Sequence, residues 1–161
     1  MKQILKGEDP NYENIQNMKL IQFCIKEALR MCPPAIFIAR NPIQDEELIG
    51  YSIPKNQTCF LSILGVHYSE KYWEKPYEFN PKRWETIDEK KKKFCYFPFS
   101  VGPRDCAGRN LALVEASIVT AIVLQRYFIQ FPDNFNSDDV VLDSKFVMKL
   151  KNLQIQLIKR E

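Results

Sequence analysis

A cysteine with positively charged neighbours is the residue of this sequence best suited to chemistry. Cys106 lies between Arg104 and Arg109, and Gly108 follows it two residues later. Gly102 and a proline precede it, which predicts a tight turn, because glycine accepts backbone angles that other residues avoid and proline fixes its own. We expect an apolar helix directly behind the loop, with its free N–H groups and positive dipole end facing the sulfur. These features favour the thiolate form of Cys106.

A thiolate can serve as a nucleophile, a redox sensor or a metal ligand, and a cysteine in a glycine turn can also be a small buried residue. Phe97 and Phe99, ahead of the turn, would exclude water from the site, whereas redox sensing needs exposure. One thiolate facing an apolar slot beside an arginine is typical of a single-cysteine haem site. A thiol phosphatase is disfavoured, because its arginine stands six residues after the cysteine and this chain has Ala112 there.

The segment from Phe99 to Gly108 fits the pattern F-x-x-G-x-R-x-C-x-G at every fixed position. It resembles the haem-binding loop of the cytochrome P-450 family, the haem-thiolate monooxygenases. The resemblance implies that Cys106 is the axial ligand of haem iron and that Arg104 binds a propionate. It also implies that Phe99 and Val101 pack against the porphyrin and that backbone N–H groups near Gly108 tune the sulfur.

A β-prone segment follows the helix-breaking pair Pro33-Pro34 and runs from Ala35 to Arg40. From the residues alone it is an extended core strand. In the family, the corresponding segment lines the substrate pocket and offers an arginine to a haem propionate. Arg40 stands at the matching position, and its planar guanidinium suits a carboxylate.

Residues 1–12 are polar and predict a loop. An amphipathic helix is predicted over about residues 13–31, and it places Glu27 within the apolar stripe with Arg30 beside it. Such a pair is either a weak surface ion pair or a buried pair held by further partners, and the helical pattern favours burial. The two residues resemble the family's E-x-x-R. By this resemblance, Arg83 of a P-x-R segment completes a structural triad that braces the cysteine loop, although Lys82 stands where the family usually has glutamate.

The middle of the chain is expected to be irregular. A hairpin is predicted from Leu48 to Leu61, with its turn at residues 54–56. A short helix over residues 64–70 would carry His67, and a lone histidine beside an apolar segment is more often a packing residue than a ligand. Residues 67–81, rich in aromatic residues and proline, predict a packed irregular loop similar to the family's meander.

Four successive lysines close the segment from Asp88 to Lys93. Such a run usually indicates a solvated loop. The alternative is a docking surface for an acidic redox partner.

An apolar core helix is predicted from Asn110 to about Phe128, and its A-x-x-E resembles the family's L helix. Residues 140–149 and 153–159 alternate well enough to form two strands joined at residues 151–152. They resemble the terminal β-hairpin of the family.

Composition indicates an ordinary globular chain of 161 residues, with 45% apolar and 27% charged residues. The net charge of +3 is too small to indicate nucleic-acid binding. Five cysteines without a C-x-x-C pair indicate reduced thiols and an intracellular protein, and a single histidine disfavours a zinc site. No secretory signal opens the chain, and the longest apolar stretch is too short to span a bilayer.

The resemblance as a whole implies a mainly α fold with small β-sheets (α+β). Residues 1–161 would be a single partial domain, the C-terminal third of a cytochrome P-450. The implied activity is a monooxygenase that uses haem, O2 and a reductase docked on the basic proximal face to oxidise an apolar small molecule. The family's distal acid–threonine helix and membrane anchor have no match in this sequence. An inactive fragment is therefore the alternative, and association with the endoplasmic reticulum would belong to a longer parent.

Overall fold

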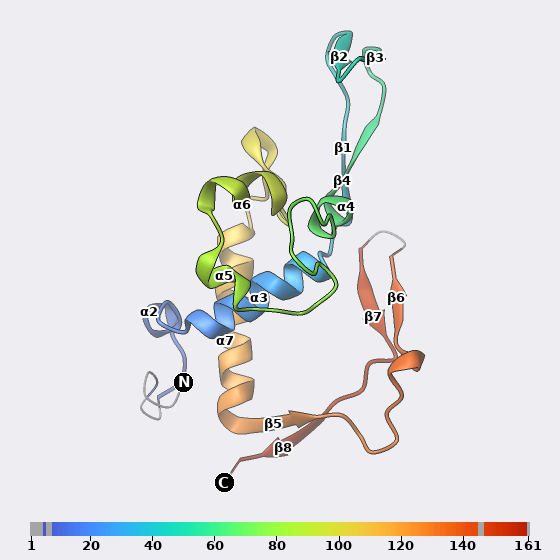
Figure 1. Ribbon diagram of the computed structural model, residues 1–161. Helices are drawn as coiled ribbons and strands as arrows, with labels where there is room; N and C mark the ends of the chain where they lie inside the picture. The colour runs from blue at the N-terminus through green and yellow to red at the C-terminus, as the bar shows by residue number, and fades with distance from the viewer. Residues whose placement is uncertain (1–4, 6–7, 145–146, 161) are drawn as a thin grey trace.

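Two groups of helices, each followed by a group of strands, succeed one another along the chain (Figure 1). The structure, a computed structural model, describes residues 5, 8–144 and 147–160. For Lys91 it describes only the backbone. Within this part, no helix is long and apolar enough to cross a bilayer. The helices are α2 (Tyr12–Ile15), α3 (Lys19–Met31), α4 (Ile63–His67), α5 (Arg83–Thr86), α6 (Glu89–Cys95) and α7 (Arg109–Arg126), with 3₁₀ turns η1 (Gly102–Arg104) and η2 (Ser137–Asp139).

The strands form four separate antiparallel pairs. In order along the chain, β1 pairs with β4, β2 with β3, β5 with β8, and β6 with β7. The mixed helix and small-sheet architecture confirms the predicted α+β class. The strands are β1 (Phe37–Arg40), β2 (Glu46–Leu48), β3 (Tyr51–Ile53), β4 (Cys59–Ser62), β5 (Tyr127–Gln130), β6 (Val141–Asp143), β7 (Lys149–Lys151) and β8 (Gln156–Lys159).

The first predicted helix is divided into α2 and α3. The side chain of Asn11 accepts hydrogen bonds from two N–H groups of α2 and begins that helix, which therefore starts within the segment expected to be a loop. The amide of Gln22 donates to the carbonyl of Ile15 at 2.9 Å and satisfies the end of α2. α3 then ends before Pro33-Pro34, as the sequence predicts. The remaining residues expected in the loop, 1–4 and 6–7, lie outside the described part.

The predicted hairpin is wrong in its pairing. Ile49 and Gly50, with φ of 53° and 80°, form the tight turn between β2 and β3. The expected turn at residues 54–56 lies instead at the base of this hairpin, where Lys55 N–H donates to the Asp45 carboxylate at 2.7 Å. β4 returns to pair with β1, so the β2–β3 hairpin projects from the rest of the fold (Figure 1).

The terminal strands also pair differently from the prediction. β6 pairs with β7, and β8 pairs with β5, the strand that directly follows α7 (Figure 1). Asn152, at φ 62°, redirects the chain after β7, and its side-chain amide donates to the carbonyl of Asp139 at 3.1 Å. The two predicted strands are therefore not partners, because the chain leaves the first sheet before the second strand begins. Residues 145–146 of the first predicted strand lie outside the described part.

The lysine-rich segment forms a helix and not the expected loop. The Asp88 side chain accepts a hydrogen bond from Lys90 N–H at 2.8 Å and caps the N-terminus of α6. Cys95, at the other end of α6, is fully buried. Lys90 and Lys93 are exposed, so the helix presents part of its positive charge to solvent.

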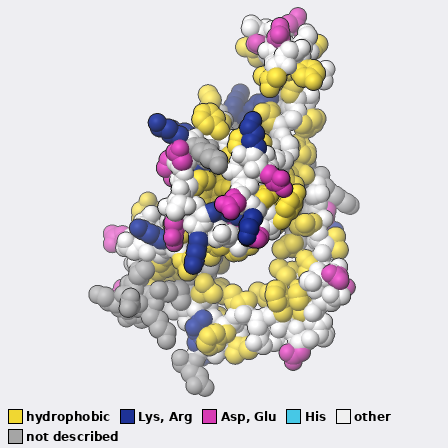
Figure 2. Space-filling view, in the orientation of Figure 1, with side chains coloured by type: hydrophobic (Ala, Val, Ile, Leu, Met, Phe, Trp, Pro, Cys, Tyr) yellow, Lys and Arg dark blue, Asp and Glu magenta, His cyan; other side chains and the backbone are white. Residues whose placement is uncertain are grey.

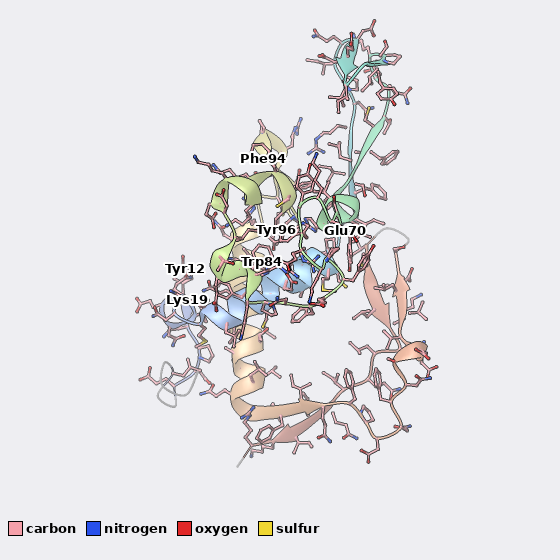
Figure 3. The ribbon with its side chains drawn as sticks, viewed as in Figure 1. Tyr12, Lys19, Glu70, Trp84, Phe94 and Tyr96 are labelled. Carbon is pink, nitrogen blue, oxygen red and sulfur yellow. The ribbon has the colours of Figure 1, made fainter. Side chains whose placement is uncertain are left out.

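Two apolar clusters hold the helices together. The first joins α2 and α3 to one side of α7 and contains the fully buried Ala121. The second is aromatic and contains Trp73, Trp84 and Cys95, with Tyr96 packed against it. Figure 3 shows Trp84 and Tyr96 close together beside α3, and their ring centroids are 4.5 Å apart.

α7 is less buried than a core helix. Of its residues only Ser117 and Ala121 are buried, whereas Leu111 is 70% and Val119 53% exposed. Among the described residues, α2 and α3 pack against one side of the helix. In the space-filling view, hydrophobic side chains border an opening between the helices and the terminal strands (Figure 2). Exposed apolar side chains gathered in this way indicate a contact surface.

Candidate functional site

The loop that carries Cys106 is closed by main-chain hydrogen bonds. Ser100 and Gly102 adopt positive φ values of 64° and 80°, and η1 begins at Gly102. Ser100 N–H donates to the carbonyl of Phe97 at 3.0 Å, and Cys106 N–H donates to that of Phe99 at 2.9 Å. The tight turn predicted here is confirmed, and its second hydrogen bond fixes the backbone of the cysteine itself.

Cys106 is exposed and lies just before the N-terminus of α7. Gly108 caps this helix, and a Cβ placed on it would lie 3.8 Å from the Cys106 sulfur. At that distance a larger side chain would occupy space beside the sulfur. Glycine at this position therefore leaves the sulfur open to a ligand.

The two arginines beside the cysteine have different electrostatic surroundings. Arg109 forms an ion pair with Asp105 at 2.9 Å, which offsets its charge. Arg104 is exposed and makes no ion pair with the residues that the structure describes. The sequence interpretation counted both charges and missed the pairing, although the i,i+4 spacing of Asp105 and Arg109 was visible.

Arg40 comes from β1, yet it contacts the cysteine loop. One Nη group donates to the hydroxyl of Ser100 at 3.1 Å, and the other donates to the carbonyl of Ala39 at 2.8 Å. Phe99 is half-buried and Val101 is 53% exposed in the same loop. The fold thus places a second exposed guanidinium and an apolar side chain in the part of the molecule that carries the cysteine.

Glu27, Arg30 and Arg83 form a buried ion cluster, which we call the support cluster. The Glu27 carboxylate accepts hydrogen bonds from Arg30 Nη2 and Arg83 Nε, each at 3.0 Å. Both Glu27 and Arg30 are fully buried. The indole of Trp84 and the N–H of Asn80 also donate to the Glu27 carboxylate, each at 3.0 Å. Five hydrogen bonds therefore reach one carboxylate, counting the second contact from Arg30.

The support cluster holds its charge despite burial. Burial alone would raise the pKa of Glu27, but the hydrogen bonds from Arg30 and Asn80 and the two guanidinium charges lower this pKa below its usual range. The sequence interpretation named the three ionic members. It missed Trp84, for which the only signal was its place next to Arg83.

The arginines of the support cluster also bind the irregular loop that follows α4. Arg30 donates to the carbonyls of His67 at 2.9 Å and Glu78 at 3.3 Å. Arg83 donates to the carbonyl of Glu74 at 2.8 Å. These bonds satisfy backbone groups that no regular element pairs, which explains how a packed irregular segment persists at the predicted place.

His67 is a buried packing residue, as the sequence predicts. Its Nδ1 lies 3.0 Å from the carbonyl of Arg30, and its Nε2 accepts a hydrogen bond from Phe97 N–H at 3.1 Å. The imidazole stacks on Tyr96 with centroids 5.4 Å apart. Burial, with a smaller contribution from the Arg30 charge, lowers the pKa of His67 to about 4.

The exposed groups around Cys106 suit a flat, anionic, thiolate-ligated cofactor. A haem needs a thiolate with open space beside it, an apolar surface and cations for its carboxylates. The open side of the sulfur at Gly108, the exposed Val101 and the guanidinium groups of Arg40 and Arg104 meet these needs.

A family model described as cytochrome P450 matches residues 1–157. The chain belongs to the cytochrome P450 family. Members of this family are haem-thiolate monooxygenases, and the resemblance stated from the cysteine loop is thereby confirmed.

Curated relatives come from animals and plants. Human "Cytochrome P450 4F12" is 35% identical over 139 residues, which cover 83% of this chain and 26% of the relative. "Carotene epsilon-monooxygenase, chloroplastic" of Arabidopsis thaliana is 36% identical over 136 residues, covering 81% of this chain and 25% of that protein. The chain thus spans about a quarter of the length of these P450 relatives.

Solved structures agree with the family assignment. A crystal structure of the cytochrome P450DA heme domain matches with a TM-score of 0.86 and 26% sequence identity. The match covers 99% of this chain and 36% of that one. The whole described fold is therefore a part of the P450 fold.

Proposed function

We propose that this chain binds haem through the Cys106 thiolate and forms the thiolate side of a monooxygenase that inserts one atom of O2 into an apolar organic substrate. The exposed sulfur at the N-terminus of α7, with Gly108 beside it, is the observation that carries the proposal. When bound, a thiolate-ligated haem supplies the oxygen-activating chemistry. Residues 1–161 would form one partial domain of such an enzyme.

Each residue around Cys106 has a distinct role in this proposal. Arg40 and Arg104 bind the carboxylates of the cofactor, because a guanidinium can donate two parallel hydrogen bonds to a carboxylate. Phe99 and Val101 contact its apolar face, and Gly108 leaves room beside the sulfur. The support cluster and α7 hold the loop in place.

We place the proposed substrate site on the surface next to β1. A groove of about 420 Å³ is lined by Ile36, Phe37, Phe60, Ser62 and Leu64. Four of these five side chains are apolar, which supports an apolar substrate.

The exposed lysines of α6 are our candidate contact for an acidic redox partner. Lys90 and Lys93 lie on the helix that ends shortly before the cysteine loop. Complementary charge mainly speeds the encounter between proteins. Five cysteines without a C-x-x-C pair support an intracellular place for the reaction.

The reduced carbon monoxide spectrum tests the role of Cys106. The experiment uses the 161-residue chain, supplied with haem, and a chimaera in which residues 1–157 replace the matching part of a longer relative. Thiolate ligation shifts the Soret band strongly to the red, and we expect this band in the chimaera but not in its Cys106→Ser variant. Cys32→Ser, at another exposed cysteine, is the matched control and should keep the band. A chimaera that binds haem without the red-shifted band would refute the proposal.

The alternative is that these 161 residues are inactive by themselves. The exposed apolar side of α7 and the quarter-length match to the relatives favour it. A red-shifted band in the chimaera and none in the chain alone would establish this alternative without contradicting the role of Cys106.

A further inference from the structure

We propose that His67 is a positioning residue that couples the support cluster to the loop carrying Cys106. The inference takes Cys106 as the iron ligand, as proposed above. It extends the interpretation of His67 as a packing residue, because the two ring nitrogens contact two separate parts of the site.

The hydrogen-bond partners of His67 define one tautomer. A backbone N–H can only donate, so Nε2, at 3.1 Å from the nitrogen of Phe97, must be the acceptor. Nδ1 therefore carries the proton and donates to the carbonyl of Arg30 at 3.0 Å. A neutral imidazole satisfies both contacts at once, whereas a doubly protonated ring would place two donors against each other at Phe97.

Arg30 and His67 form a reciprocal pair. The guanidinium of Arg30 donates to the carbonyl of His67 at 2.9 Å, while the imidazole of His67 contacts the carbonyl of Arg30. Each side chain thus binds the backbone of the other residue. Because Arg30 also binds Glu27, the imidazole is attached directly to the support cluster.

From His67 the contacts continue to the cysteine. Phe97 N–H donates to the imidazole, and the carbonyl of Phe97 accepts from Ser100 N–H at 3.0 Å. Within the same turn, the carbonyl of Phe99 accepts from Cys106 N–H at 2.9 Å. Losing the bond at Phe97 would release the first residue of this closed loop.

Burial, and after it the charge of Arg30, lowers the pKa of His67 and keeps the imidazole neutral. Arg30 faces it from α3, and Tyr96 stacks on it from the segment after α6. The Glu27 carboxylate is occupied by the two arginines and Trp84. Nε2 of the imidazole therefore remains an acceptor for Phe97 N–H at neutral pH.

Two substitutions separate the two contacts. The amide of His67→Gln reaches the place of Nε2 and can still accept from Phe97, whereas that of His67→Asn reaches only the place of Nδ1. His67→Phe keeps a ring and removes both bonds. Tyr68→Phe is the control, because the Tyr68 hydroxyl donates to the carbonyl of Met31 at 2.9 Å, also at the end of α3, without contacting the cysteine loop.

Hydrogen exchange at Phe97 N–H in the haem-free chain and chimaera is the first measurement. We expect exchange to be about tenfold faster in His67→Phe and His67→Asn, and nearly unchanged in His67→Gln and Tyr68→Phe, since an unmade buried hydrogen bond costs a factor of this order. Equal acceleration in His67→Phe and Tyr68→Phe would overturn the proposal. So would nitrogen NMR placing the imidazole proton on Nε2.

The second measurement uses the reduced carbon monoxide spectrum of the haem-loaded chimaera. The quantity measured is the fraction of the Soret absorption that lies at the red-shifted position of thiolate-ligated haem. We expect His67→Phe and His67→Asn to lose this fraction at a pH where His67→Gln and Tyr68→Phe keep it. If all four variants keep the same fraction, the proposal is overturned. If the unchanged chimaera lacks the red-shifted band, the proposed function fails, and the exchange and NMR results on haem-free protein still decide the role of His67.

Discussion

Glu27 shows how one buried carboxylate can organise segments that are far apart in the sequence. It accepts hydrogen bonds from Arg30, three residues away, and from Asn80, Arg83 and Trp84, more than fifty residues away. A buried charge is tolerated only when partners of this kind replace water. Removing the charge therefore affects two chain segments at once, α3 and the segment from Asn80 to Trp84.

Replacing Glu27 by glutamine should destabilise the fold strongly. The change leaves the guanidinium of Arg30 buried without a counter-charge, which costs about 3 to 5 kcal/mol. Urea unfolding of the chimaera, followed by tryptophan fluorescence, measures this loss. The control is Glu78→Gln, since the Glu78–Lys75 pair is exposed and should contribute less than about 1 kcal/mol. Equal losses in the two variants would contradict the structural role of Glu27.

The pH dependence of stability should carry the signature of His67. Its pKa is about 4 in the folded state against 6.5 ordinarily, so the unfolded chain binds the proton more tightly. Stability is then fully present above pH 6.5 and is lost as the pH falls towards 4, by about 3 kcal/mol in total. Urea unfolding between pH 7 and 4.5 measures the slope. In His67→Phe the slope in this window should become flatter, and an unchanged slope would contradict the assignment.

At the scale of the element, the cysteine loop combines two glycines with different duties. Gly102 has a φ of 80° and open space around it, so its role concerns the backbone alone. Gly108 has an ordinary φ of −83°, and its role concerns the space beside the sulfur. The same residue type thus serves the backbone turn at one position, and at the other we propose that it keeps the space beside the sulfur open.

Substitution of these glycines should separate stability from cofactor binding. Gly102→Ala should lower the free energy of unfolding by about 1 kcal/mol, because an L-residue is strained at that φ. Gly108→Val should change stability little and weaken haem retention in the chimaera, since its side chain would stand beside the Cys106 sulfur. Urea unfolding of haem-free protein and the haem content after gel filtration give the two readouts. Haem content unaffected by Gly108→Val would refute the role of this glycine.

On the scale of the whole molecule, the described fold is open along one side of α7 and around the terminal strands. Large apolar side chains on these elements are about half exposed, including Val119, Phe128 and Leu142. Figure 2 shows such side chains around the opening. A surface of this kind needs a covering partner to be stable in water.

The 161-residue chain by itself should therefore be poorly stable and prone to aggregate. We expect it to bind a hydrophobic dye such as ANS and to elute as a mixture of oligomers, whereas the chimaera elutes as a monomer with little dye binding. Dye fluorescence and light scattering after size exclusion measure both properties. A monomeric, haem-free chain that melts cooperatively would contradict this expectation.

The sequence predicted the elements whose signals are local. A glycine-proline turn before Cys106, the apolar run of α7 and a glutamate within the apolar stripe of α3 are each visible within a few residues. Strand pairing was predicted wrongly for both expected hairpins. At the first of them, the chain could turn after β2 at Ile49-Gly50 or later, and the sequence does not rank the two turns. The contacts of His67 lie 37 and 30 residues away, so the coupling role that we propose for it could not be predicted from neighbouring residues.

Arg40 is held in a defined orientation before any ligand arrives. Its two Nη groups already donate to Ala39 and Ser100, so the side chain has lost much of its rotational freedom during folding. Immobilising an arginine side chain costs up to about 2 kcal/mol of conformational entropy. Because Arg40 is already ordered in the folded chain, this entropy is lost during folding and not when a ligand binds. A carboxylate that binds beside the cysteine loop would therefore contact a cation of fixed position. An asymmetric ligand would then bind in one orientation in preference to the flipped one.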